Sequence, residues 1–266
     1  MTTTADWDGA TYHRVSEPQF AWGLRVLERL RLDGDETVVD AGCGSGRLTA
    51  RLLERLPRGR VIAVDRSASM LQVAAEELRP RHGDRVTFLE ADLLDLDRHL
   101  PGAADVVFST ATFHWVLDHP RLFAVLHEVL RPGGRLYAQC GARGNLQRAH
   151  GHAERLARRP EFAPYFERWS NPWEYAGAET TRDRLQAAGF VDVETSVEPA
   201  PTVFADRNAY REFAGTVIMR PFLAPLPTEA LRDRMLDGMC EAAAGDDPPW
   251  SLDYRRLNLA AARPLS

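Results

Sequence analysis

The sequence of 266 residues contains no lysine, and all 33 of its basic residues are arginine. This absence excludes a Schiff-base lysine, a lysine general base and a phosphate-binding loop that ends in lysine followed by serine or threonine. Because the bias extends over the whole chain, we attribute it to the codon usage of a GC-rich genome rather than to a particular site.

Cysteine is scarce as well. Cys43, Cys140 and Cys240 are odd in number and lie far apart, without the spacing of a metal site or a disulfide framework. We therefore expect each thiol to fill apolar space in a reducing compartment, and we expect no metal cofactor.

The chain also lacks a long apolar run. No stretch of 18 or more apolar residues occurs, and the first seven residues are neither basic nor apolar enough for a signal peptide. A net charge of -5 and a pI near 5.9 argue against a large nucleic-acid-binding face. We expect a cytoplasmic protein that binds a small molecule, and neither a membrane nor a nucleic acid.

Short β-branched runs alternate with helical stretches from Glu36 to Gly141, which is typical of a parallel sheet covered by helices on both faces. Ser67 is expected to cap one of these helices, and Pro120 to begin another. The pattern predicts an α/β fold with a Rossmann-like sheet of seven strands. The predicted strands are 37–41, 60–65, 85–90, 105–109, 134–140, 190–197 and 252–261.

The same pattern predicts how the chain is divided. The predicted parts are an N-terminal helical cap (1–35), a ligand-binding core (36–143), a lid insertion (144–178) and a C-terminal part of the core (179–266) with a second helical insertion at about 206–244. Open α/β sheets bind ligands at the carboxyl ends of their strands, so we expect both insertions to form a lid there.

Two of these segments carry distinctive side chains. An apolar stripe marks an amphipathic helix in the cap, and an aromatic cluster lies in the first insertion. The stripe is Phe20, Leu24, Leu27 and Leu30, and the cluster is Phe162, Tyr165, Phe166, Trp169, Trp173 and Tyr175.

Glycine occurs at every second position directly after the first predicted strand. Asp40 closes that strand, and Gly42, Gly44 and Gly46 follow it. Glycines allow positive φ and close approach of a ligand, while free amides at the next helix start face the bound group. The dinucleotide fingerprint would need a third glycine at position 47, where this chain has Arg47. The spacing therefore weakens the alternative of an NAD-dependent oxidoreductase.

The acid-x-Gly-x-Gly-x-Gly segment resembles the first motif of class I S-adenosyl-L-methionine (SAM) methyltransferases. The resemblance implies the seven-stranded class I methyltransferase sheet with an antiparallel final strand, SAM as cofactor and S-adenosyl-L-homocysteine as product. It places Asp40 near the cofactor's ammonium group. Asp65 and Asp92, at the next two strand ends, would accept hydrogen bonds from the ribose hydroxyls and from the adenine amino group, respectively.

Further residues in these segments are implied to line the cofactor site. Met70 either packs on the adenine face or belongs to the core of its helix. The exit of the fourth strand is expected to lie at the methionine end of the cofactor. The remaining residues of this set are Arg66, Leu93 and Ser109.

A longer series of segments resembles the trans-aconitate methyltransferases, which esterify a carboxylate of a small polycarboxylic acid. The matching segments include residues 5–16, 40–44, 64–70, 115–119 and 215–223. The chain departs from that family at 162–175, which is more aromatic here, and at His114, where the family has glutamine.

A narrower similarity concerns carboxyl methyltransferases of the juvenile-hormone-acid and salicylic-acid kind. It rests on Tyr12, the segment Ser16-Glu17-Pro18-Gln19, and Trp115. The similarity implies that a glutamine amide and an indole N–H hold the substrate carboxylate. Each residue has a structural alternative, because Ser-x-x-Gln before a helix is a capping box and Trp115 can anchor the lid.

These observations favour methyl transfer to a carboxylate oxygen of a small molecule, with catalytic candidates Tyr12, Gln19, His114 and Trp115. The alternative is C- or N-methylation of an aromatic, for example indolic, metabolite, with His114 or His13 as base. Either histidine can also be structural. A noncatalytic SAM-binding regulator is a third reading. The oligomeric state is left open.

One further group is a candidate for binding substrate carboxylates. Arg148, Arg155 and Arg159 align at helical spacing in the first insertion, and the alternative is a solvated helix face.

Overall fold

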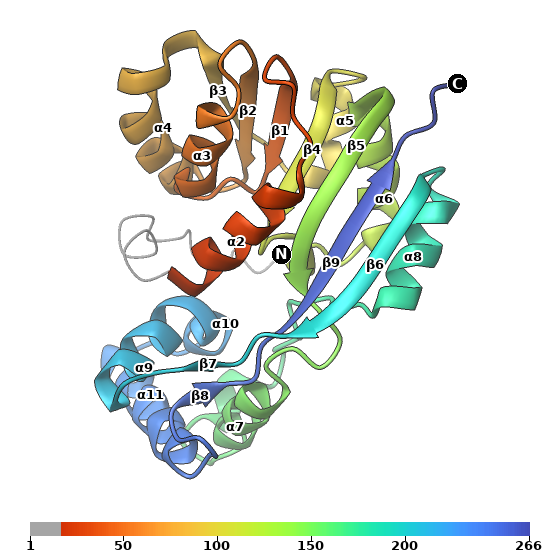
Figure 1. Ribbon diagram of the computed structural model, residues 1–266. Helices are drawn as coiled ribbons and strands as arrows, with labels where there is room; N and C mark the ends of the chain where they lie inside the picture. Colours follow the sequence, from red (N-terminus) through yellow and green to blue (C-terminus); the bar gives the residue numbers. More distant parts are fainter. Residues whose placement is uncertain (1–16) are drawn as a thin grey trace.

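A computed structural model describes residues 17–266 (Figure 1). Its main sheet has seven strands in the order β3-β2-β1-β4-β5-β9-β6, and β9 runs antiparallel to both of its neighbours. The predicted sheet, with its antiparallel final strand, is confirmed. The strands are β1 (Thr37–Ala41), β2 (Arg60–Asp65), β3 (Val86–Glu90), β4 (Ala104–Thr110), β5 (Leu130–Gly141), β6 (Val191–Pro199) and β9 (Arg255–Ala262).

Two predicted strands differ from the structure in extent. β5 begins at Leu130, several residues before the expected start, because the chain is already extended when helix α6 ends. The predicted strand 252–261 is two strands, since β8 (Ser251–Leu252) pairs with β7 (Thr202–Val203) in a small second sheet before β9 begins.

Helices cover both faces of the main sheet. One face is covered by α2 (Glu17–Arg29), α3 (Arg47–Glu54) and α4 (Ala68–His82), whose apolar side chains share a core with β1 and β2. The other face is covered by α5 (Leu96–His99), α6 (His119–Val129) and α8 (Ala178–Ala187). Burial on both faces explains the continuous β-branched runs of the central strands, such as Val38 and Val39, which are fully buried.

The expected helix signals have mixed outcomes. The Ser67 hydroxyl accepts a hydrogen bond from the Met70 amide at 3.2 Å and caps α4, as predicted. In α2 the predicted stripe is partly wrong. Its buried face is formed by Trp22, Val26 and Leu27 among others, whereas Phe20 and Leu24 are only half-buried. Leu30 is buried just beyond the end of the helix. Packing against α3 and the sheet determines which face of α2 is buried. The periodicity of the helix sequence alone gives no information on that packing.

The two insertions pack on each other as one layer, which we call the lid layer. It lies beyond the carboxyl ends of the parallel strands (Figure 1) and has its own apolar core. The first insertion contributes α7 (Gln147–Ala157), and the second contributes α9 (Arg207–Phe213), a π-helical turn (Ala214–Ile218), α10 (Arg220–Leu223) and α11 (Glu229–Ala244).

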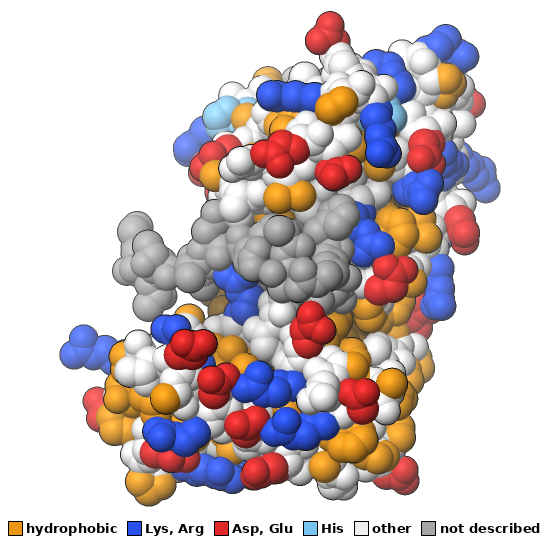
Figure 2. All heavy atoms as spheres, turned by 90° about the vertical axis from the view of Figure 1, so that its left-hand side faces the viewer, with side chains coloured by type: hydrophobic (Ala, Val, Ile, Leu, Met, Phe, Trp, Pro, Cys, Tyr) orange, Lys and Arg blue, Asp and Glu red, His pale blue; other side chains and the backbone are white. Residues whose placement is uncertain are grey.

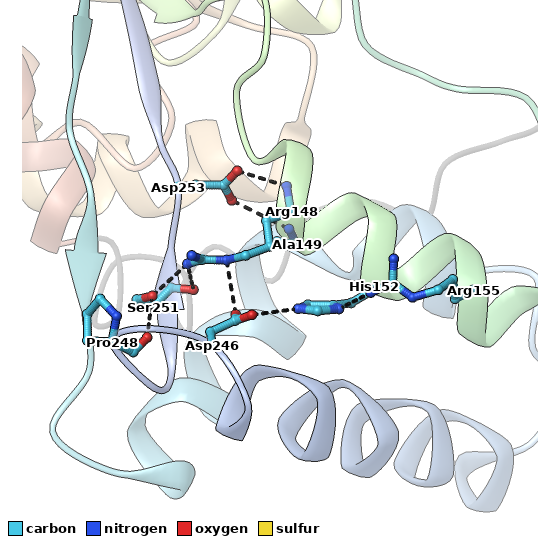
Figure 3. A network of polar contacts seen from close by, with 8 residues as sticks. All are labelled: Arg148, Ala149, His152, Arg155, Asp246, Pro248, Ser251 and Asp253. Atoms are coloured by element: carbon cyan, nitrogen blue, oxygen red, sulfur yellow. Dashed lines mark hydrogen bonds and ion pairs between the residues drawn. The ribbon is translucent and has the colours of Figure 1, made fainter.

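Polar contacts also join the two insertions (Figure 3). The Arg148 guanidinium lies 3.1 Å from Asp246 and donates to the Ser251 hydroxyl at 2.6 Å, and its backbone amide donates to Asp253 at 2.8 Å. His152 and Asp246 are 2.9 Å apart, and Arg155 contacts His152. Arg148 and His152 therefore connect α7 to residues 246–253, and Arg155 contacts His152 within α7. These contacts argue against the hypothesis that Arg148 and Arg155 bind a substrate.

The outer surface of the lid layer carries both signs of charge, interspersed over α9 and α11 (Figure 2). Arg207 lies 2.6 Å from Asp237, and Arg211 lies 2.7 Å from Asp233. Exposed pairs of this kind each contribute little to stability. Among the helices of residues 17–266, none is long and apolar enough to cross a membrane.

The α3–α4 contact depends on a glycine. Gly46 has φ +82°, and a Cβ placed there would lie 2.9 Å from side-chain atoms of Ala74 and Leu78. We expect Gly46→Ala to lower the free energy of unfolding by about 2–4 kcal/mol, through backbone strain plus overpacking. Urea unfolding without ligand measures it.

Gly102→Ala is the matched control, because Gly102 has φ +61° and no atom within 4 Å of the added Cβ. It should lose about 1 kcal/mol from strain alone. Equal losses in the two variants would contradict a packing role for Gly46.

Candidate active site

Three cavities meet at the carboxyl ends of β1 and β4. The large cavity, of about 290 Å³, lies between the glycine loop and the ends of β2 and β3. The loop cavity, of about 60 Å³, lies under the glycine loop. The ring-lined cavity, of about 40 Å³, lies between the sheet and the lid layer. Ala111, which follows β4 and has φ +55°, lines all three. The reacting groups of two ligands can therefore meet beside Ala111.

The glycine loop is built for close approach. The amides of Gly42 and Cys43 donate to the Val64 carbonyl at 2.8 and 2.9 Å, which ties the loop to β2. Gly44 has φ +54°, and no atom of residues 17–266 lies within 4 Å of a Cβ placed on it, so its backbone borders the large cavity without obstruction from these residues. A ligand can rest against this backbone. Gly46, by contrast, does not line the cavities, because it separates α3 from α4.

Asp65 ends β2 and lines the large cavity with Arg66 and Met70. Its two carboxylate oxygens accept hydrogen bonds from the amides of Gly44 (2.9 Å) and Ser67 (3.0 Å). Burial raises the pKa of this carboxyl, while the two amides oppose the increase. The carboxylate borders the cavity, so Asp65 can also accept a hydrogen bond from a ribose hydroxyl.

Asp92 follows β3 and lines the same cavity together with Leu93. One of its oxygens accepts the Leu94 amide at 2.9 Å, which fixes the carboxylate at the start of a short 3-10 turn. The predicted acids at the ends of β2 and β3 and the predicted Met70 thus lie around one cavity. Val116 and Leu117, which were not predicted, also line it.

Asp40 lines the loop cavity rather than the large one. Its side chain is buried, and the Thr49 hydroxyl donates to it at 2.6 Å. Burial raises its pKa to about 7, and the nearby charge of Asp65 adds to this increase. A cation beside Asp40 would favour the ionised carboxylate, so the residue suits an ammonium group.

Ser109 does not lie at a cavity surface. Its hydroxyl is buried and donates to the Ala41 carbonyl at 2.7 Å, so it links β4 to β1. The expectation that Ser109 contacts the cofactor is not supported by this position. Its neighbours Thr110 and Ala111 line the large and loop cavities instead.

His114 and Trp115 lie in the 3-10 turn Phe113–Trp115 after β4, and both line the ring-lined cavity. The Gly141 amide donates to Nδ1 of His114 at 3.3 Å, which assigns the proton of the neutral ring to Nε2. Burial, with the charge of Arg256 second, holds the pKa of His114 well below its ordinary value. His114 is therefore a neutral hydrogen-bond donor, and this disfavours its predicted alternative role as a base.

The residue that the sequence did not reveal is Arg256, on β9. It lines the ring-lined cavity although only 2% of its surface is exposed. Its Nε donates to Gln139 on β5 at 3.3 Å, and its guanidinium lies 4.7 Å from the centre of the Trp22 ring on α2. Among the described residues that line this cavity, it is the sole arginine, and no aspartate or glutamate lines it. A buried guanidinium here suits an anionic ligand.

Gln19 comes from α2 and also lines the ring-lined cavity. Its amide nitrogen lies 3.5 Å from the Tyr254 hydroxyl, and its buried amide oxygen has no hydrogen-bond partner among residues 17–266. Ser16, its partner in the predicted capping box, lies outside the described residues, as do Tyr12 and His13. Gln19 thus offers a polar group to a ligand.

The predicted aromatic cluster is divided between two places. Trp173 and Tyr175 line the ring-lined cavity. Trp169 belongs to the lid core, where its indole donates to the Pro221 carbonyl at 2.9 Å and stacks on Phe222 at 4.7 Å. Other residues that line this cavity and were not predicted are Asn145, His150 and Tyr254.

Comparisons with known proteins agree with this arrangement. Residues 38–134 match the model of a methyltransferase domain family. The chain is 31% identical to a trans-aconitate 2-methyltransferase of an Acidovorax species over 242 residues, 87% of this chain and 86% of the relative. It is 38% identical over 133 residues to a trans-aconitate 2-methyltransferase of an Azoarcus species, and that match spans only 50% of each protein.

A solved structure shows the same fold. Phosphoethanolamine N-methyltransferase 2 of Haemonchus contortus, in complex with phosphomonomethylethanolamine and S-adenosylhomocysteine, matches with a TM-score of 0.62 at 19% identity. The match covers 96% of this chain and 57% of that one.

The raised pKa of Asp40 predicts that the affinity of the protein for a cationic ligand depends on pH. A ligand cation selects the ionised form, so binding of S-adenosylhomocysteine should tighten as pH rises toward the pKa of about 7 and then level off. Calorimetry should show about a fivefold to tenfold gain between roughly pH 6 and pH 7.5.

Asp40→Asn should remove this slope. Asp92→Asn is the control, because it alters the large cavity and should weaken binding by a similar factor at each pH. A slope that persists in Asp40→Asn would show that another group titrates.

Proposed function

The chain belongs to the class I SAM-dependent methyltransferases, within the family of the trans-aconitate 2-methyltransferases, and we propose that it methylates a carboxylate oxygen of a small organic acid. The observation that carries this proposal is the buried guanidinium of Arg256 at the cavity next to the cofactor site. The family assignment also replaces the alternatives of an oxidoreductase and a noncatalytic regulator.

The cofactor residues divide between two cavities. In the proposal, Asp65 and Asp92 hold the nucleoside in the large cavity, Met70 and Leu93 pack on it, and Arg66 lies beside it. Asp40 faces the amino-acid end from the loop cavity. When bound, SAM supplies an electrophilic methyl group on a sulfonium. In the proposal, the methyl group lies beside Ala111, which lines all three cavities.

Arg256 and the Nε2–H of His114 are proposed to bind the acceptor carboxylate, with Gln19 and Trp115 beside them. A carboxylate attacks the methyl carbon directly, so no proton has to be removed. The residues then act by alignment and by exclusion of water. Small acids are also what the names of the relatives indicate, since trans-aconitate is a polycarboxylic acid.

C- or N-methylation of an aromatic metabolite is the second candidate. The rings of Trp115, Trp173 and Tyr175 around the cavity favour it. The Gly141 amide on Nδ1 of His114 opposes it, because the remaining ring nitrogen carries a proton and cannot accept another.

The chemical stability of the product distinguishes the two candidates. We expect the methylated product to be an ester that dilute alkali cleaves to methanol and the free acid. Isotope-labelled SAM, a panel of carboxylic acids and indoles, and mass detection before and after alkali provide the measurement. An alkali-stable product, or labelling of indoles alone, would overturn the proposal.

The donor role of His114 predicts an unequal effect of two substitutions. His114→Gln keeps an N–H near the position of Nε2 and should retain most of kcat/KM, whereas His114→Ala should lose about tenfold to a hundredfold. Steady-state kinetics, with S-adenosylhomocysteine binding as a folding control, measures both. Equal and near-complete loss in both variants would indicate a base.

Arg256→Gln removes the charge that the carboxylate needs. We expect kcat/KM to fall by about a hundredfold or more, because a buried charged hydrogen bond is lost, while cofactor affinity stays near that of the unmodified protein. Arg255→Gln is the matched control, since Arg255 is the exposed neighbour on β9. An Arg256→Gln enzyme of full activity would exclude this guanidinium as the carboxylate site.

A further inference from the structure

The ring-lined cavity has little positive charge. Arg256 is its sole arginine among the described residues, and the two histidines that line it do not add to the charge at neutral pH. Burial holds the pKa of His114 well below its ordinary value and lowers that of His150 to about 4. One carboxylate therefore finds a cation. A second or third carboxylate would be buried without one, which is strongly unfavourable.

Stacked rings line the cavity. Trp173 and His150 stack on each other at 4.4 Å with an angle of 13° between their planes, and Trp173 and Tyr175 are 6.1 Å apart at 10°. His114 continues the series, 5.7 Å from Tyr175 at 23°. The four rings form one stack, the stacking wall, which borders a narrow space of about 40 Å³. A narrow space bordered by rings favours a flat molecule over one that is puckered.

The polar atoms available away from Arg256 are neutral. Nε2 of His150 is buried without a hydrogen-bond partner in the part of the chain that the structure describes, and so is the amide oxygen of Gln19. Both residues line the cavity. A hydroxyl on the acceptor can both donate and accept and would satisfy them, and neither residue supplies a positive charge for an additional carboxylate.

We propose that the acceptor is a planar monocarboxylic acid, bound through its single carboxylate to Arg256 and packed through its ring or conjugated chain against the rings of Trp173, His150 and Tyr175 that line the cavity. This inference rests on the proposed carboxylate methylation and narrows the substrate class within it. In the reaction, a carboxylate oxygen forms the new bond to the methyl carbon while the carbon–sulfur bond breaks, and S-adenosylhomocysteine leaves with the electron pair. The products are a neutral ester and a neutral thioether.

The test compares matched acids on the unmodified enzyme. Benzoate and cyclohexanecarboxylate carry the same single carboxylate on a flat and on a puckered six-membered ring, and cinnamate against benzylidenemalonate adds one carboxylate. We expect kcat/KM to be about tenfold or more higher for the planar and for the singly charged member of each pair. trans-Aconitate should be methylated more slowly than cinnamate.

A preference for trans-aconitate, or equal rates within both pairs, would overturn the inference and leave the proposed function intact. If no acid is esterified while indoles or amines are methylated, the proposed function itself fails. The two failures are therefore distinguishable by the products.

Two lid tryptophans provide variants for the same assay. Trp173→Leu should reduce the benzoate-to-cyclohexanecarboxylate ratio about fivefold, because the stacking wall loses its central ring. Trp169→Leu should keep the ratio, since Trp169 packs in the lid core and does not line the cavity. An unchanged ratio in a folded Trp173→Leu enzyme would contradict the stacking role.

Discussion

The reversal of strand order between β1 and β4 is the constraint on which both halves of the site depend. These neighbours are parallel, but their following helices, α3 and α6, cover opposite faces of the sheet, so the two exit loops separate and leave a crevice. The glycine loop forms one side, and residues 110–117 form the other. Ala111 keeps a left-handed backbone there, at a cost of about 1 kcal/mol, and its amide bonds to the Gln139 carbonyl at 2.8 Å. That bond holds the turn where the three cavities meet.

The charged side chains on the two sides of this crevice suit the transfer of a methyl group from a cation to an anion. The buried Asp40 and the partly buried Asp65 lie on the cofactor side, and the buried guanidinium of Arg256 lies on the other. On the proposed function, a sulfonium and a carboxylate meet between them and lose their charges as the bond forms. A dry cavity favours that loss, because low polarity stabilises the neutral products more than the charged reactants. Trp22 and Gln139 contact Arg256 and help to keep it in place.

Much of the cofactor half could be predicted from the sequence because its parts are local. Asp40, Asp65 and Asp92 end successive strands, and the parallel register of β1, β2 and β3 brings strand ends to one edge of the sheet. The same logic placed His114 and Trp115 after β4. It did not distinguish residues that line the cavities from residues that build them, which is why Gly46 and Ser109 were expected to contact the cofactor. Their roles depend on α3–α4 packing and on a bond between strands.

The acceptor half was harder to predict because it is assembled from distant segments. Arg256 follows Arg255 in the sequence, and only the pairing of β9 between β5 and β6 decides which of the two is buried. The sequence predicted a strand at 252–261 without indicating what its side chains would contact. His150 and Tyr175 belong to the lid layer, whose position depends on packing between the two insertions. No short sequence motif indicates the contact between the two insertions.

The ring-lined cavity is built from two parts of the protein, the main sheet and the first insertion. In the proposal, the sheet holds the groups that act in the reaction, and the insertion determines which acceptor fits. Arg256 is held by the sheet, and His114 is kept as a donor by the last amide of β5. Changing either role would require a change in strand register or backbone position. The stacking wall instead comes from side chains of the first insertion, such as Trp173, which can be exchanged while the sheet stays intact. On the proposed function, the acid that this chain accepts can therefore change through the lid layer alone, while the carboxylate-binding groups stay in place. Among the described residues that line its cavity, one buried cation, Arg256, lies with several aromatic rings.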